Sequence, residues 1–240
     1  YFAALSDKKV CQYIMKDGDA QAIANIATAY SKLGVVDHAN YFAALSDKKV
    51  CQYIMKDGTP QAIANIATAY SNLGVVDHAN YFAALSDKKV CQYIMNNGNA
   101  QNMANIATAY SNLGVVDHAN YFAALSDKKM CQYIMKDGKP QEIANIATAY
   151  SNLGVVDHAN YFAALSDKKV CQYIMKDGTP QAIANISTAY SNLGVVDHAN
   201  YFAALSDKDV CQYIMKDGSP QQLANIATAF AHLGIRDNNI

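Results

Sequence analysis

The sequence predicts an all-α fold, a right-handed superhelical solenoid of six 40-residue helical repeats with two to three helices in each repeat. The segment YFAALSDKK, or a close variant, recurs at a constant spacing, and such a period is typical of stacked repeat proteins. Each repeat also contains two glycines, such as Gly18 and Gly34, and glycine just past a helix end is a common stop. We expect one repeat domain over residues 1–240, with repeats 1–40, 41–80, 81–120, 121–160, 161–200 and 201–240.

The residues after the first glycine of each repeat predict a helix, which covers about 60–73 in repeat 2. In four repeats a proline follows Thr, Lys or Ser, an order that suits an N-cap followed by proline at the first helical position. Apolar residues at helical spacing predict a buried stripe, and polar residues predict a second, exposed face. The stripe contains Ile63, Ile66, Tyr70 and Leu73, and the exposed face contains Gln61, Asn65, Thr68 and Asn72.

The segment 77–97 is too apolar for one amphipathic helix, and its apolar direction changes partway. At 100° per residue, Tyr81 points well away from Tyr93. A break at Ser86 and Asp87 explains the change, with Ser as N-cap and Asp in the first turn. We therefore favour three helices per repeat, and a kinked two-helix repeat is the alternative.

Aromatic residues on the apolar stripes are expected in the core, namely those in the columns of Phe2, Tyr13 and Tyr30, whereas the column of Tyr1 is ambiguous. In the last repeat, Ile235, Arg236, Asn238 and Asn239 replace Val, Val, His and Ala, so this end becomes more polar, which predicts a terminal cap over 235–240.

Composition restricts the class of protein. The formal charge is −1, without the basic excess that is common in nucleic-acid binders, although a solenoid can gather its lysines on one face. No apolar run is long enough to cross a bilayer, so no membrane partner is expected. Each repeat has one cysteine, and stacked equivalents lie too far apart for a disulfide. These features predict an intracellular protein, in the cytoplasm or an organelle matrix.

Catalytic and metal-binding patterns are missing from the sequence. There is no CxxC or HxxxH pair, no glycine-rich phosphate loop and only one glutamate, Glu142. We therefore expect no enzyme activity, no catalytic residue, no metal and no cofactor.

Differences between the six repeats gather in two columns, spaced three residues apart at the start of the helix after the first glycine. This spacing places the two side chains next to each other. Neutral drift at exposed positions is one explanation. The other is that each variable pair recognises one element of a ligand, because further exposed positions such as Lys48 and Gln52 barely vary. The variable pairs are Asp19 and Ala22, Thr59 and Ala62, Asn99 and Asn102, Lys139 and Glu142, Thr179 and Ala182, and Ser219 and Gln222.

The stretches 59–74 and 220–234 resemble the PQxLANxxWAxAKLG helix of octatricopeptide repeats, although the family's Trp is absent and the repeat is slightly longer. That family is similar to pentatricopeptide and heptatricopeptide proteins, α-solenoids that bind single-stranded RNA in organellar gene expression. The resemblance implies a concave surface lined by this helix, RNA as the partner, and a role in post-transcriptional regulation. The variable pairs would then select bases, about one per repeat.

Two further columns are candidate ligand contacts. An asparagine column can hold a base or an extended peptide backbone, or can serve a structural bond; it contains Asn25, Asn65, Asn105, Asn145, Asn185 and Asn225. Lysine pairs at the start of a predicted helix suit phosphate, or form a solvated turn; they contain Lys8, Lys9, Lys48, Lys49, Lys88, Lys89, Lys128, Lys129, Lys168, Lys169 and Lys208.

The sequence thus favours modular, sequence-specific binding of single-stranded RNA. The alternative is a protein or peptide scaffold of armadillo-like type, in which the asparagine column grips an extended peptide, and the near-neutral charge favours it. A spacer or self-assembling array without a fixed ligand is a third hypothesis.

Overall fold

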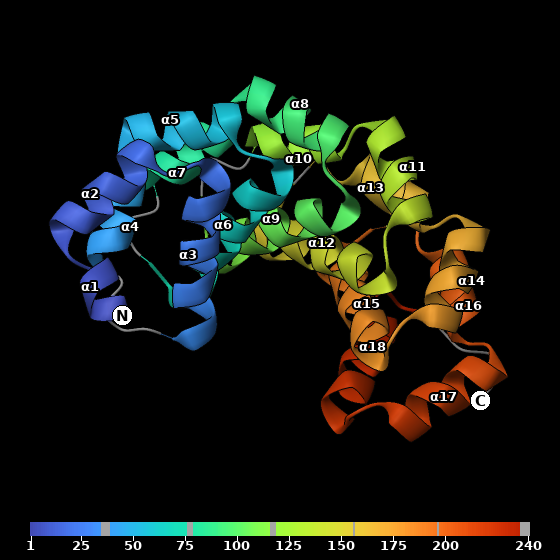
Figure 1. The fold of residues 1–240 in the computed structure, drawn as a ribbon. Coiled ribbons are helices and arrows are strands. Elements are labelled where there is room, and N and C mark those ends of the chain that lie inside the picture. Colours follow the sequence, from blue (N-terminus) through green and yellow to red (C-terminus); the bar gives the residue numbers. More distant parts are fainter. Residues whose placement is uncertain (35–38, 76–78, 116–118, 156, 196, 236–240) are drawn as a thin grey trace. The chain divides into compact units, whose positions relative to one another are not determined.

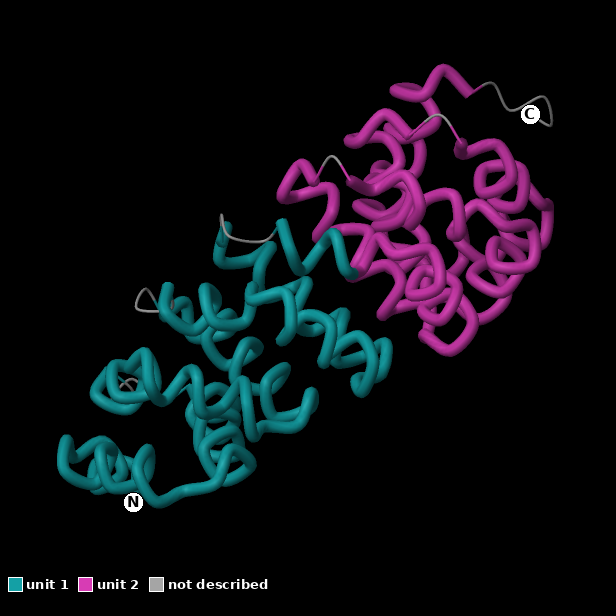
Figure 2. The backbone as a smooth tube through the Cα atoms, turned by 90° about the horizontal axis from the view of Figure 1, so that it is seen from above, with its two compact units in different colours: residues 1–124 teal, residues 125–240 magenta. Residues whose placement is uncertain are grey.

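The computed structural model describes residues 1–34, 39–75, 79–115, 119–155, 157–195 and 197–235. These residues form eighteen helices, three in each repeat, and contain no strand (Figure 1). The predicted helical solenoid of repeats is confirmed, and its right-handed course stays a prediction. The chain divides into two compact units, unit 1 (Tyr1–Ala124) and unit 2 (Leu125–Ile240), which are coloured separately in Figure 2 and are described one at a time below.

The helices occupy equivalent positions in the six repeats. The first helices are α1 (Phe2–Leu5), α4 (Ala39–Leu45), α7 (Ala79–Leu85), α10 (Ala119–Leu125), α13 (Ala159–Leu165) and α16 (Ala199–Leu205). The middle helices are α2 (Lys8–Asp17), α5 (Lys48–Asp57), α8 (Lys88–Asn97), α11 (Lys128–Asp137), α14 (Lys168–Asp177) and α17 (Lys208–Asp217). The third helices are α3 (Ala20–Leu33), α6 (Pro60–Leu73), α9 (Ala100–Leu113), α12 (Pro140–Leu153), α15 (Pro180–Leu193) and α18 (Pro220–His232).

The third helices form one packed row within each unit. In unit 1, α6 lies between α3 and α9, and in unit 2, α15 lies between α12 and α18 (Figure 1). Helix α6 covers the predicted span, with Ile63, Ile66 and Tyr70 fully buried. Alanines are buried between these large side chains, and their small volume allows neighbouring helices to approach closely.

The two glycines of a repeat end helices for different reasons. Gly74 follows α6 with a left-handed backbone at φ 60°, as the sequence predicts. Gly58 follows α5 with an extended backbone at φ −79°, so the left-handed explanation is wrong there. A Cβ at Gly58 would lie 2.5 Å from the carbonyl oxygen of Ile54, and this close approach is what requires glycine.

The break between the first and middle helices is confirmed, but its cap is aspartate instead of serine. The Asp47 carboxylate accepts hydrogen bonds from the backbone N–H groups of Lys49 (2.9 Å) and Val50 (3.2 Å). The hydroxyl of Ser46 instead lies 2.9 Å from that of Tyr70, in the buried interior. Because the Ser46 hydroxyl is engaged in the interior, the adjacent Asp47 caps the two free N–H groups.

The middle helix of one repeat packs on the first helix of the next, as α2 does on α4 and α5 on α7 in unit 1. Tyr81, in the column that the sequence left ambiguous, is fully buried and donates its hydroxyl to the carbonyl oxygen of Ile63 at 2.7 Å. The columns of Phe2 and Tyr30 supply core rings, as predicted: Phe42 and Tyr70 are fully buried with ring centroids 5.0 Å apart. Phe42 also makes an edge-to-face contact with Tyr30 of the preceding repeat at 6.3 Å, so the ring contacts continue from one repeat to the next.

The Tyr13 column was wrongly predicted to be core. The side chain of Tyr13 is 66% exposed, and that of Tyr93 is 36% exposed. Tyr93 donates its hydroxyl to the carbonyl oxygen of Gly58 in the preceding repeat at 3.2 Å. The column therefore lies at the edge of the contact between repeats, where one side of the ring meets solvent.

The cysteines are free thiols, and five of the six are buried. Burial, with a smaller contribution from Asp47, raises the pKa of Cys51 to about 12, so this thiol is protonated at neutral pH. No group of His, Cys, Asp or Glu among the described residues could hold a metal ion. Nor does any described helix have the length and apolar character needed to span a membrane. In the predicted cap, Arg236, Asn238 and Asn239 lie outside the described residues, whereas Ile235 is half-buried.

Candidate functional site

The first variable column lies at the N-caps of the third helices, and all six of its residues are exposed. The Asp19 carboxylate accepts a hydrogen bond from the backbone N–H of Ala22 at 2.6 Å, and the Thr59 hydroxyl accepts one from that of Ala62 at 3.2 Å. These N-cap side chains therefore cap the helix and also face solvent. The exposed N-cap residues are Asp19, Thr59, Asn99, Lys139, Thr179 and Ser219.

The second variable column lies at the third helical position, where exposure differs between repeats. Ala62 and Ala182 have no exposed surface, which corrects the expectation that both members of each pair face a ligand. The cause is packing, because the start of each third helix lies against the preceding repeat. Asn102 in unit 1 is 3% exposed and donates its amide to the Gln61 side chain at 2.9 Å. Gln222 in unit 2 makes the equivalent bond to Gln181 at 2.8 Å.

Helix capping connects the two variable columns. In repeat 3, Asn99 and Asn102 cap each other reciprocally, and in repeat 6 Ser219 and Gln222 do the same. The Lys139 side chain has no acceptor atom, and in that repeat the Glu142 carboxylate accepts a hydrogen bond from the backbone N–H of Lys139 at 2.9 Å. Five repeats thus cap the third helix with the N-cap side chain, and in repeat 4 the Glu142 side chain binds the N-cap backbone instead, which is a structural reason for the two columns to vary together.

A row of amides follows the third helices, in which the glutamines are exposed and most of the asparagines are half-buried. Gln61 donates its side-chain amide to the Oδ1 atom of Asn65 at 2.7 Å, and equivalent bonds join Gln21 to Asn25 and Gln181 to Asn185. The Asn65 amide group donates no hydrogen bond to the described part of the chain. The asparagine column therefore has an internal acceptor bond and an N–H₂ group that remains able to bind a ligand.

The lysine pairs lie at the start of the middle helices and are exposed. In each repeat the capping aspartate already binds two of the free backbone N–H groups and places a negative charge at the positive helix end; in repeat 3 this residue is Asp87. Fewer backbone N–H groups are therefore free for phosphate at this helix end, and phosphate contact by the lysines stays a prediction. The lysine side chains stay available to an anion.

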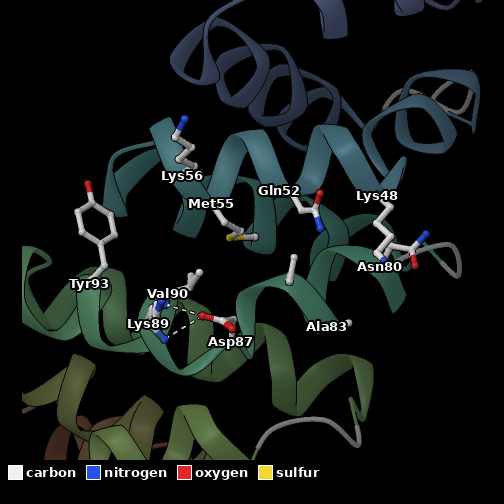
Figure 3. Close-up of a pocket in the computed structure, with 11 residues that line it drawn as sticks. Lys48, Gln52, Met55, Lys56, Asn80, Ala83, Asp87, Lys89, Val90 and Tyr93 are labelled. Carbon is white, nitrogen blue, oxygen red and sulfur yellow. Dashed lines mark hydrogen bonds between the residues drawn. The ribbon is translucent and has the colours of Figure 1, made fainter.

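A groove lies between the middle helix of one repeat and the first two helices of the next. In unit 1 it separates α5 from α7 and α8 and has a volume of about 750 Å³ (Figure 3). Gln52 and Met55 of α5 project into it, and Ala83 and Val90 line the opposite side. Equivalent grooves occur between α2 and α4 in unit 1 and between α11 and α13 in unit 2.

This groove could not be predicted from the sequence. Its lining comes from three helices in two repeats, and no single one of these residues has a distinctive motif. The only signal was that exposed residues such as Lys48 and Gln52 are invariant between repeats while the third-helix starts vary. A scan against models of known protein families finds no match. A search of curated proteins finds no significant match either.

Proposed function

We propose that the chain binds single-stranded RNA along the row of third helices, with about one base per repeat. The observation that carries this proposal is the position of the N-cap column, which is exposed in all six repeats and chemically different in most of them. It borders the Gln-Asn row, whose amides can donate and accept hydrogen bonds at base edges. The resemblance to octatricopeptide repeats supports the same surface.

Under this proposal, fewer side chains contact the bases than the sequence suggested. In repeats 2 and 5, Thr59 and Thr179 are the only exposed members of their pairs, so both repeats should prefer the same base. In repeat 3, Asn102 acts through Asn99, which it holds in place with a reciprocal hydrogen bond. The N-cap residue is therefore the proposed base contact, and the third helical residue positions it.

The test is selection from a random pool of single-stranded RNA, repeated with Thr59→Asn combined with Ala62→Asn. This double variant copies the pair of repeat 3, so the fold has a precedent for it within the chain. We expect the preferred base to change at one position only. Lys32→Glu is a control outside the pair, and it should leave the preference unchanged. An equal loss of binding to all RNA sequences in the double variant would contradict selection by individual repeats.

Peptide binding along the asparagine column is the second candidate, and the charge distribution favours it. The net charge is −1, and the capping aspartates add negative charge beside the lysine pairs. A random peptide pool is therefore tested in parallel. Binding of RNA should weaken as salt is raised, through displacement of bound cations from the phosphates, and a ligand held mainly by amides should respond much less.

A further inference from the structure

The groove between repeats combines an apolar floor with a charged rim. Met55 is 5% exposed and forms the floor together with the alanines and Val90 of the next repeat. Lys48 lies at one end beside Asn80, and Lys56 lies nearer the other end, by Tyr93 (Figure 3). Methionine is flexible and polarisable, so a floor of this kind accommodates apolar side chains of different shapes.

Part of the groove lining is constant in all six repeats, including Gln52 and Ala83. Gln52 is exposed and forms no hydrogen bond with the described part of the chain, yet all six repeats have glutamine at this position. Ala83 is exposed on α7, and its column is alanine throughout. The third-helix starts of the same repeats have diverged, so exposed positions in this chain are able to change. A ligand that makes the same contact in successive repeats is one restraint that would keep such positions constant.

The charge of the groove is opposite to that of the chain as a whole. Three lysines and one aspartate line the groove in unit 1, and the equivalent groove in unit 2 has the same set. The carboxylate of Asp87 is engaged with the backbone N–H groups of Lys89 and Val90. Because three lysines outnumber this one carboxylate, the net charge at the rim is positive, although the formal charge of the protein is −1. Such a rim favours an acidic ligand.

We propose that these grooves bind acidic peptide segments, with one apolar side chain of the peptide on the Met55 floor and its carboxylates at Lys48, Lys56 and Lys89. The apolar floor favours peptide over RNA at this site. Bases stack on open aromatic faces, and the one aromatic residue here, Tyr93, lies at the end of the groove with its hydroxyl bound to Gly58. This surface is separate from the third-helix row and does not depend on the proposed RNA binding.

The experiment uses the intact chain with ¹³C-labelled methionine methyl groups. The probe is a short synthetic peptide in which single Leu residues are separated by pairs of Glu. We expect the methyl signals of Met15, Met55 and Met135, which line the three grooves, to shift on titration. Met103, fully buried in α9, should not shift. The same peptide with Lys in place of Glu should have no effect.

Lys48→Glu combined with Lys89→Glu tests the rim. An acidic residue suits the first turn of a helix, and Asp209 occupies the second lysine position in repeat 6, so the variant should fold. We expect the affinity reported by Met55 to fall by roughly tenfold, since two favourable pairs become repulsive, while Met135 in the unchanged groove keeps its response. Lys32→Glu makes a single charge reversal outside the grooves and should change neither signal.

Three results would overturn the proposal. These are unchanged methyl signals at saturating peptide, equal shifts at Met103 and Met55, or an undiminished Met55 response in the double variant. A mixed-sequence single-stranded RNA is titrated separately. If RNA shifts the groove methionines and the acidic peptide does not, the groove is a nucleic-acid site and the peptide assignment is wrong.

Discussion

The third helices and the middle helices both begin with free backbone N–H groups that need acceptors, but they differ in how constant the capping residue is. At the third helices, the capping residues differ from repeat to repeat, and Asp, Thr, Asn and Ser side chains or a neighbouring Glu all provide an acceptor. At the middle helices the cap is aspartate in all six repeats, as in Asp47 and Asp87. Free N–H groups at a helix start need an acceptor, but several side chains provide one.

Variation is therefore tolerated where capping is the only structural demand, and it is absent where the capping residue has further contacts. Asp87 binds two backbone N–H groups, lines the groove and lies close enough to Cys91 to raise the pKa of its thiol. Thr59 accepts one hydrogen bond and otherwise faces solvent. The comparison indicates that side-chain diversity at the third helices can serve ligand selection with little loss of stability.

The largest effect that we expect in this comparison is that of Asp87→Ala. This substitution removes the acceptor for the N–H groups of Lys89 and Val90 and the negative charge at the helix start, at a cost of about 2 kcal/mol. Hydrogen exchange of the α8 amides measures the loss, with α14, capped by Asp167, as the internal control. A change below about 0.5 kcal/mol would show that this cap is dispensable.

A smaller effect is expected at the third helices, with a clear difference between two repeats. Thr59→Ala removes the hydrogen bond to Ala62 and should cost about 1 kcal/mol. Lys139→Ala should cost less than about 0.5 kcal/mol, because the Lys139 side chain makes no capping bond and Glu142 still accepts from its backbone. Urea denaturation of the two variants provides the comparison. Equal losses would mean that capping does not account for the variable columns.

The smallest effect concerns thiol ionisation. Burial, followed by the Asp87 charge, raises the pKa of Cys91 to about 12. Asp87→Asn should lower this pKa while leaving it above the usual value, because burial is the larger cause. Because the thiol pKa is higher in the folded protein than its usual value of 9.0, the free energy of unfolding falls as the pH rises from 9.0 toward about 12. The variant has the smaller pKa shift, so its free energy of unfolding should fall less over this range.

The measurement is the pH dependence of alkylation followed by peptide mapping. Repeat 3 has Asn96 where the other repeats have lysine, and repeat 4 has Met130 where the other repeats have valine. The tryptic peptides that contain Cys91 and Cys131 therefore differ in sequence. Cys131 should keep its pH profile. A Cys91 profile that is unchanged by Asp87→Asn would leave burial as the only cause of the shift.

Much of the fold could be predicted because the relevant signals are local. The span of α6 follows from a proline, a glycine and an apolar stripe, and the break between α7 and α8 follows from a change in apolar direction within one segment. The capping residue at that break was misassigned because Ser and Asp are both good N-caps and adjacent. Which of them caps depends on Ser46 having a buried partner in Tyr70, a contact across the fold.

The candidate sites were less predictable because contacts between repeats decide exposure. Helical spacing predicts that the two variable columns are adjacent, and they are, but it does not show that Ala62 lies against the preceding repeat. Helical spacing also placed Tyr93 on an apolar stripe and so suggested burial, but its ring lies at the edge of the contact between repeats and is partly exposed. The groove depends on residues about one repeat apart, so no spacing within a single helix could indicate it.

The hydroxyl of Tyr81 binds Ile63, which lies 18 residues earlier in the sequence, and that of Tyr70 contacts Ser46, which lies 24 residues earlier. Such bonds recur along the chain, and even the side-chain bonds between neighbouring third helices span only 41 residues. The entropy lost in closing each loop is consequently set by the repeat and not by the number of repeats. Folding can start at any pair of neighbours and extend stepwise, so lengthening the array should hardly slow its formation.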